Sequence, residues 1–195
     1  MKYFEIRLVT NCAKKYANFL NDYEPYVEYY EFMDIGKSFK GFSNTPIIFE
    51  RDKSYKNDEP ISDFLLNDWA ELIVSERIYT MLKEKYSDEI EFYKCFAKDE
   101  GILKPYYILR TKYKIDVLDR ENSVMDGVLG TAIKSVIINN IPNNYNFFYI
   151  KDGAQMVISE QLYNDLKALN PTNFEVTQIY TTSELIKKNE QKIKN

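Results

Sequence analysis

A repeated segment is the feature that most constrains the fold of this chain. Residues 64–92 align without a gap with residues 148–176, and the alignment places Ser75 on Ser159. Roughly a third of the aligned positions are identical and most others are chemically similar, as in an internal repeat. The alternative is that two unrelated segments share the same strand–helix pattern. We favour two related halves, and we call residues 64–92 the first copy and residues 148–176 the second copy.

Each copy carries the pattern of a strand, a helix and a second strand. In the first copy the apolar run 72–74 predicts a buried strand, and Ser75 follows as a helix N-cap. Ile78 and Leu82 then recur at helical spacing, and alternation resumes near Ile90. The second copy repeats this order, with Ser159 as its cap. The copies therefore predict two strand–helix–strand halves.

The rest of the chain predicts further short elements. Alternating or apolar segments favour strands at 3–9, 46–50, 104–119 and 133–138. Helical spacing favours a helix at 12–20, and a capping signal at Thr182 predicts a helix at the C-terminal end. We therefore expect an α+β fold with mixed sheets and helices packed on them, forming a single compact domain over residues 1–195.

Composition excludes several kinds of active site. The chain has no histidine, which removes His-containing catalytic triads and His-ligated zinc. Its two cysteines, Cys12 and Cys95, are too few for a cysteine-only zinc site. We interpret them as reduced, buried thiols, with one disulfide as the open alternative.

Charge and hydropathy indicate which partners and which compartment to expect for this protein. The formal net charge of −4 argues against binding to nucleic acid, because such proteins carry a basic excess. The N-terminus has no signal-peptide pattern, since Glu5 and Arg7 interrupt the apolar stretch. No apolar run reaches the length of a membrane span. We expect a soluble, cytoplasmic protein that does not bind membranes.

No motif supports catalysis. The six glycines match neither a phosphate-binding loop nor a dinucleotide fingerprint. Asp116 and Asp119 are carboxylates near one another, but at the end of a strand we interpret them as turn residues. Ser75 and Ser159 have no histidine to activate them and are interpreted as helix caps. We therefore predict a protein that is not an enzyme and that has no cofactor and no metal site.

An acidic and aromatic segment is the strongest binding feature of the sequence. Carboxylates alternate there with tyrosines, which combines negative charge with rigid anchors and suits a basic partner. The alternative is an ordinary half-buried element with a solvated face. The predicted interface consists of Tyr23, Glu24, Tyr26, Glu28, Tyr29, Tyr30 and Glu31.

The C-terminal half also resembles a known family. Tyr106-Tyr-Ile-Leu, then Ile115-Asp-Val-Leu-Asp-Arg-Glu-Asn-Ser, Val157-Ile-Ser-Glu-Gln-Leu and Phe174-Glu-Val follow one another in an order similar to that of bacterial polymorphic-toxin immunity proteins. The resemblance is to the Myxococcus-type immunity domain and covers about residues 104–180. The chain departs from it at 170–173, where Asn-Pro-Thr-Asn replaces the usual glycine before the closing strand.

The resemblance implies a non-enzymatic cytoplasmic protein that binds and neutralises one cognate toxin domain, encoded in the neighbouring gene. It brings no catalytic residues. Two other functions stay open: a regulatory domain that binds a small molecule or a peptide, and a metal-dependent hydrolase built on carboxylates. The tyrosine content and the expected sheet edges are also compatible with a homodimer.

Overall fold

The protein is described by a computed structural model in two compact units. Unit 1 comprises Met1–Ile6, Tyr113–Asp165 and Val176–Asn195, and unit 2 comprises Arg7–Lys112 and Leu166–Glu175. The expectation of a single compact domain stays a prediction. The residues that the structure describes are 1–7, 16–20, 46–54, 59–68, 71–130, 132–137, 141, 144–152 and 156–193.

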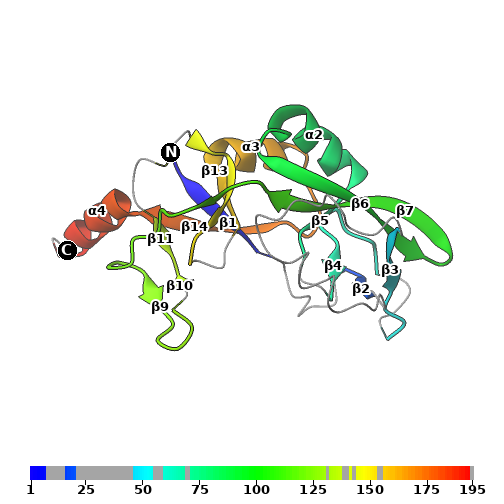
Figure 1. Ribbon diagram of the computed structural model, residues 1–195, viewed down its shortest axis with the longest axis horizontal. Helices are drawn as coiled ribbons and strands as arrows, with labels where there is room; N and C mark the ends of the chain where they lie inside the picture. Colours follow the sequence, from blue (N-terminus) through cyan, green and yellow to red (C-terminus); the bar gives the residue numbers. More distant parts are fainter. Residues whose placement is uncertain are drawn as a thin grey trace. The chain divides into compact units, whose positions relative to one another are not determined.

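Unit 1 is built on a six-stranded mixed sheet with the order β11-β14-β1-β13-β12-β8. Four of its strands, β11, β14, β1 and β13, are labelled in Figure 1. β13 pairs antiparallel with β1 and β12, whereas β11–β14 and β12–β8 are parallel. Apolar side chains of these strands, among them Phe148 and Val157, form a core with Leu118 and Ile137. The strands are β1 (Tyr3–Arg7), β8 (Lys114–Ile115), β11 (Val136–Ile137), β12 (Phe147–Ile150), β13 (Met156–Ser159) and β14 (Glu175–Thr181).

A short hairpin and two helices accompany this sheet. β9 (Val124–Met125) and β10 (Ala132–Lys134) pair antiparallel and are drawn as a separate hairpin in Figure 1. Helix α3 (Glu160–Ala168) follows β13 directly, and α4 (Thr182–Ile193) follows β14. The helix expected from Thr182 is confirmed.

Unit 2 contains a second six-stranded mixed sheet, with the order β4-β2-β3-β6-β7-β5. Helix α2 (Glu76–Tyr86) buries Ile78, Leu82 and Tyr86. The core joins Phe19, Phe49 and Ile108, all almost fully enclosed. The strands are β2 (Asn18–Leu20), β3 (Ile47–Arg51), β4 (Leu66–Asn67), β5 (Ile73–Ser75), β6 (Ile90–Asp99) and β7 (Ile102–Thr111).

The long hairpin β6–β7 dominates unit 2. Its ten pairs run without interruption from Ile90–Thr111 to Asp99–Ile102. Glu100 and Gly101 form the two-residue turn, both with positive φ (48° and 81°), as the right-handed twist of a tight hairpin requires. β6 also pairs in parallel with β3, and β7 pairs antiparallel with β5, so the α+β class with mixed sheets is confirmed.

The two copies have the same local arrangement. In the first copy, β5 and β6 are joined by α2 and flank β7, while in the second copy β13 and β14 are joined by α3 and flank β1. The registers agree as well, because Ser75 faces Tyr106 of β7 and Ser159 faces Tyr3 of β1. The predicted strand–helix–strand pattern is thus present in both copies, although their common origin stays a prediction.

One expected element is wrong. Residues 12–20 were expected to form a helix, but Asn18–Leu20 is strand β2, and residues 12–15 lie outside the described part. Phe19 is fully buried between two half-buried neighbours. As a strand, this segment pairs with β3 and β4, which satisfies its backbone hydrogen-bonding groups. The pairing and the burial of Phe19 outweigh the helical spacing of the local sequence.

Candidate functional site

The interface predicted from the sequence is not described by the structure. Tyr23, Glu24, Tyr26, Glu28, Tyr29, Tyr30 and Glu31 all lie outside the described residues. Their role stays a prediction. Two other arrangements of polar and aromatic side chains are described, both in unit 2: a network centred on Asp63, and an exposed sheet face on β3, β6 and β7.

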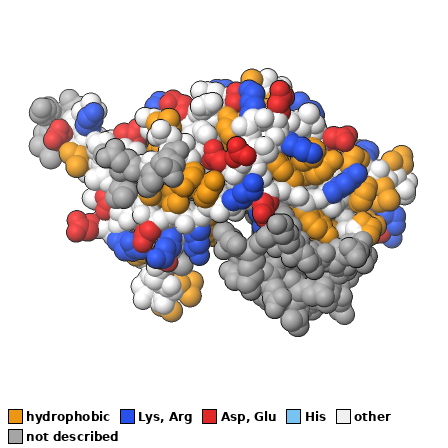
Figure 2. Space-filling model, turned by 45° about the horizontal axis from the view of Figure 1, so that its top comes forward, with side chains coloured by type: hydrophobic (Ala, Val, Ile, Leu, Met, Phe, Trp, Pro, Cys, Tyr) orange, Lys and Arg blue, Asp and Glu red, His pale blue; other side chains and the backbone are white. Residues whose placement is uncertain are grey.

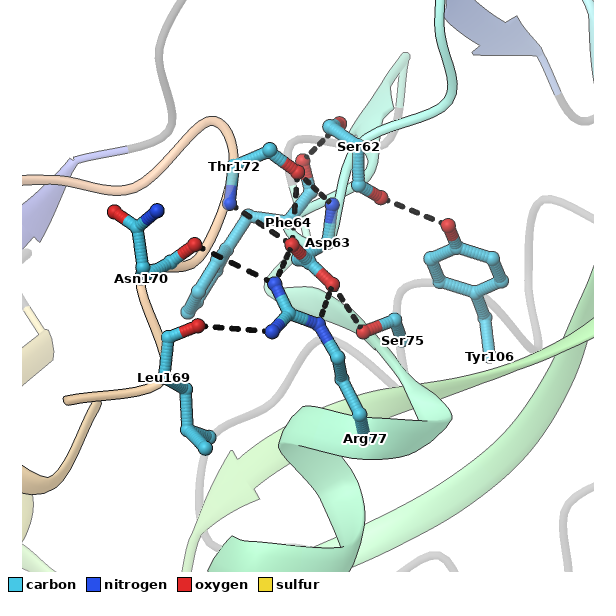
Figure 3. A network of polar contacts seen from close by, with 9 residues as sticks. All are labelled: Ser62, Asp63, Phe64, Ser75, Arg77, Tyr106, Leu169, Asn170 and Thr172. Carbon is cyan, nitrogen blue, oxygen red and sulfur yellow. Dashed lines mark hydrogen bonds and ion pairs between the residues drawn. The ribbon is translucent and has the colours of Figure 1, made fainter. Parts of the chain in front are cut away.

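Asp63 lies just before the first copy and accepts five hydrogen bonds (Figure 3). The Ser75 hydroxyl and Arg77 Nε donate to Oδ1 over 2.8 and 2.7 Å. The Thr172 amide and hydroxyl donate to Oδ2 over 2.9 and 2.8 Å, and Arg77 Nη2 donates to the same oxygen. Arg77 also donates to the Leu169 carbonyl over 2.8 Å. The carboxylate therefore joins the start of the first copy to the loop after α3 within one unit.

Side chains around this carboxylate extend the network. The Tyr106 hydroxyl donates to the carbonyl of Ser62 over 2.8 Å, and the ring of Phe64 stacks on Phe174 with centroids 4.9 Å apart. Asn173 Nδ2 donates to the Phe64 carbonyl over 2.9 Å. Polar backbone groups that would otherwise be buried without partners are thus satisfied on both sides of Asp63.

The carboxyl of Asp63 is held ionised. Burial opposes its ionisation, but the hydrogen bonds from Arg77, Thr172 and Ser75 outweigh that effect and hold its pKa well below the usual range. A carboxylate with this pKa and five donors around it is unsuited to proton transfer near neutral pH, where a general base needs a pKa close to the working pH. The network is consequently a structural clamp.

Sequence reasoning missed this clamp, although one signal was present. Arg77 stands in the first turn of α2, where a cation opposes the helix dipole, and such a position is explained by a nearby carboxylate. The partner loop could not be located from the sequence, because Thr172 is separated from Asp63 by 109 positions.

The carboxylates and serines singled out from the sequence are engaged locally. Asp119 accepts from the amides of Glu121 and Asn122, as a turn residue does, and from the Thr182 hydroxyl over 2.7 Å. Asp116 lies 3.3 Å from an Arg120 nitrogen. Over the described ranges, no group of three or more Asp, Glu, Cys or His side chains is arranged to hold a metal ion.

The two predicted helix caps behave differently. The Ser159 hydroxyl accepts from the Leu162 amide over 3.2 Å, so it caps α3 as expected. Ser75 occupies the N-cap position of α2 but makes no side-chain capping bond, so its predicted cap bond is wrong. Its hydroxyl donates a hydrogen bond to the Asp63 carboxylate over 2.8 Å.

The second arrangement is a sheet face that we call the lysine–aromatic face. The pairing of β3, β6 and β7 sets Ile48 beside Phe96 and Phe96 beside Pro105, and Lys98 pairs with Leu103 one step nearer the turn. Because alternate residues of a strand point to one side, these side chains line one face of the sheet. The face consists of Ile48, Glu50, Lys94, Phe96, Lys98, Leu103 and Pro105.

Helix α2 covers the neighbouring part of this side of the sheet. Tyr79 stacks on Tyr107, which pairs with Lys94, with ring centroids 3.6 Å apart, and it meets Phe92 edge-on at 5.1 Å. Beyond Tyr107 the face is accessible: Leu103 is 49% exposed, and Ile48, Phe96 and Pro105 are half-buried. On the right of Figure 2, where β6 and β7 lie, hydrophobic side chains are found between Lys and Arg side chains.

The comparisons with known proteins identify the class of this chain. The chain matches the model of the Immunity protein family (Imm11) over residues 11–181, most of its length, and it belongs to that family. The resemblance to polymorphic-toxin immunity proteins is thereby confirmed, and the match extends well before residue 104. No curated protein matches the chain.

Membership of this family gives the chain a role in toxin immunity. Among the helices of the described residues, none combines the length and the apolar character that crossing a membrane requires.

Proposed function

We propose that this protein binds a cognate bacterial toxin domain and neutralises it by stoichiometric protein–protein contact. The observation that carries the proposal is the match to the immunity protein family over residues 11–181. The toxin domain is encoded in the neighbouring gene, and the complex forms in the cytoplasm. The protein is not an enzyme, requires no cofactor and binds neither nucleic acid nor membrane.

Such an inhibitor acts by occupying the active-site cleft of the toxin or by holding the toxin in an inactive conformation. A stable complex of this kind buries about 1,200–2,000 Å² of total surface and depends on a few aromatic or arginine anchors. Part of the contact comes from the acidic and aromatic segment, in which Glu24, Glu28 and Glu31 supply negative charge for a basic patch on the toxin and the tyrosines supply aromatic anchors.

The test is co-expression with the product of the adjacent upstream gene, followed by co-purification and a growth assay. A stable one-to-one complex and rescue from the toxicity of that product are expected. A matched culture that expresses the neighbour with an unrelated protein controls for dilution of expression. Neither complex nor rescue would contradict this pairing.

A variant with Tyr26, Glu28, Tyr29 and Tyr30 replaced together tests the acidic and aromatic segment. Affinity for the toxin is expected to fall by about 100-fold or more, because several anchors are lost at once. The circular dichroism spectrum is expected to stay unchanged. Unchanged affinity would remove the segment from the interface and leave the immunity function standing.

A regulatory domain that binds a small molecule is the second candidate, and one observation favours it. Unit 1 contains a pocket of about 310 Å³ lined by Tyr3, Ile141 and Glu184 among others. This volume lies at the small end of the range for ligand sites. A metabolite that raises the melting temperature of the wild-type protein but not of a Glu184→Ala variant would support it.

A further inference from the structure

We propose that the lysine–aromatic face of unit 2 is a contact surface for an acidic protein surface with an apolar centre on the toxin domain. The inference rests on the proposed function and adds a second contact to it. Its site and the sign of its charge both differ from those of the acidic and aromatic segment.

The geometry of the face suits a protein contact. Its centre is the row Ile48, Phe96 and Pro105, which the pairing of three neighbouring strands holds in place. Leu103 extends this row toward the turn and is half exposed. Because the backbone of these strands is already fixed by pairing, little backbone entropy is lost when a partner covers the face.

Charge identifies the partner. Lys94 places its ammonium 5.4 Å from the centre of the Phe96 ring, and Lys98 lies on the same side of the strand. On α2, Lys83 lies 5.2 Å from the centre of the Tyr79 ring, at the covered end of the same side. Lys98 is bound to Glu50 over 2.7 Å, whereas no described carboxylate lies within ion-pair distance of Lys83 or Lys94.

Glu50 offsets Lys98 on the face, so its positive charge comes from Lys94, with Lys83 beside it, on a chain whose net charge is −4. A positive patch on an acidic protein attracts an acidic partner only when that partner is correctly oriented, which gives specificity and a fast association. Nucleic acid fits less well, because it requires several unpaired cations along a phosphate backbone and the net charge of this chain repels it.

The apolar centre supplies the other half of the recognition. An aromatic ring with a lysine above it buries apolar area and retains a charge for the partner, and aromatic anchors of this kind carry much of the energy of interfaces. The partner therefore presents carboxylates that surround an apolar side chain, in register with Lys94, Phe96 and Lys98.

The experiment uses the full chain and the purified toxin domain encoded by the neighbouring gene, in a catalytically inactive form. The association rate and Kd are measured at low and at physiological ionic strength. In a Lys94→Glu/Lys98→Glu variant, affinity is expected to fall by about 10- to 100-fold, mainly through slower association, and its dependence on salt is expected to become weaker.

Helix α4 offers a matched control. A Lys187→Glu/Lys192→Glu variant changes the net charge equally at two exposed positions, and its affinity is expected to stay within about threefold of wild type. For the apolar centre, Leu103→Ser is expected to weaken binding by about 10-fold. Ile186→Ser, at a residue of similar exposure (53% against 49%), is expected to have no effect.

The outcomes separate this inference from the proposed function. If the wild-type chain does not bind the toxin domain, the proposed function is wrong and this inference is wrong with it. If the wild type binds and both face variants bind as tightly as their α4 controls, this inference alone is overturned. It is likewise overturned if the face variants lose self-association, or binding to a short single-stranded RNA, while their affinity for the toxin stays intact.

Discussion

The first and second copies share a backbone pattern and differ in how they use charge. In both, a tyrosine in the helix stacks on the central strand, Tyr79 on Tyr107 and Tyr163 on Phe4. In both, a serine hydroxyl before the helix donates to an acidic or amide side chain 12 or 13 positions earlier. That side chain is Asp63 for the first copy and Asn146 for the second.

The exchange of a carboxylate for an amide changes what surrounds it. Asp63 is charged, and it collects Arg77 and Thr172 in addition to its serine. Asn146 is neutral and accepts from the Ser159 hydroxyl over 2.7 Å, while Ser159 also caps its helix. The comparison shows that the same arrangement of strands and helix accepts either a carboxylate or an amide as the partner of its serine. The carboxylate also binds a loop that is distant in sequence.

The largest expected effect on stability comes from removing the charged acceptor, Asp63. Asp63→Ala removes a nearly buried carboxylate that accepts five hydrogen bonds, and it leaves the Thr172 amide without its acceptor, so it is expected to lower the free energy of unfolding by about 3 kcal/mol. Asn146→Ala removes a neutral acceptor, with an expected loss of about 1 kcal/mol. Urea titrations followed by circular dichroism measure both values. Equal losses would show that the charge adds nothing.

A smaller effect is expected from Asp63→Asn, which gives the serine of the first copy an amide acceptor like the one that Asn146 offers to Ser159. The amide still accepts from Ser75 but loses the ion pair with Arg77, and the expected loss at pH 7 is about 2 kcal/mol. The folded-state pKa of Asp63 is below its unfolded value, so its stabilisation is complete above that value and is lost as the pH falls.

The pH dependence of this difference is the measurement. Unfolding free energies of wild type and Asp63→Asn are compared from pH 7 down to pH 2. The gap is expected to be constant above about pH 5 and to narrow as the pH falls below about 3.9, the ordinary pKa of aspartate. Other carboxylates titrate in both proteins, so they cancel in the difference. A gap that stays constant to pH 2 would contradict the assignment of the lowered pKa.

The repeat could be predicted from the sequence because its signals are local. Ser75, the apolar run before it and the spacing of Ile78 and Leu82 predict a strand followed by a helix, and both were found. The central strands themselves, β1 and β7, were expected as strands, but their place between the two strands of each copy could not be predicted. β7 follows the first copy, whereas β1 precedes the second by most of the chain, so no local pattern joins them to their copies.

The candidate sites show the same limit. Alternation along β6 indicates that Lys94 and Cys95 point to opposite sides, and the structure agrees, with Lys94 exposed and Cys95 fully buried. Which strand supplies the neighbouring row of the lysine–aromatic face depends on the pairing of β6 with β3, separated by more than forty residues. Non-local pairing of this kind leaves no trace in either segment.

A third, smaller effect concerns the two serines. Ser75→Ala is expected to cost about 1 kcal/mol in the wild type and almost nothing in an Asp63→Ala background, because its acceptor is already gone. Ser159→Ala is expected to cost about 1 kcal/mol in the wild type and to keep most of that cost in an Asn146→Ala background, since its bond to the Leu162 amide persists. Double-mutant cycles in urea give these values. A cost of Ser75→Ala that persists in the Asp63→Ala background would show that Ser75 acts as a helix cap after all.

The smallest expected effect concerns the stacked aromatic pairs, a feature that the two copies share. The ring centroids of Tyr79 and Tyr107 are 3.6 Å apart at an interplanar angle of 4°, and those of Tyr163 and Phe4 are 4.4 Å apart at 27°. Stacked rings contribute about 0.5–1.5 kcal/mol beyond the area that they bury. Both pairs join a helix to a central strand. On these strands Tyr107 pairs with Val74 and Phe4 pairs with Ile158, and Val74 and Ile158 are equivalent in the alignment of the copies.

Cycles of Tyr79→Leu with Tyr107→Leu, and of Tyr163→Leu with Phe4→Leu, are therefore expected to give coupling energies that agree within about 0.5 kcal/mol. Leucine retains apolar volume, so each cycle isolates the ring contact from the loss of burial. Strong coupling in one copy and none in the other would mean that the shared backbone pattern does not impose a shared packing solution. Agreement would instead locate the difference between the copies in Asp63 and its partners, where the first copy holds a loop from elsewhere in the chain.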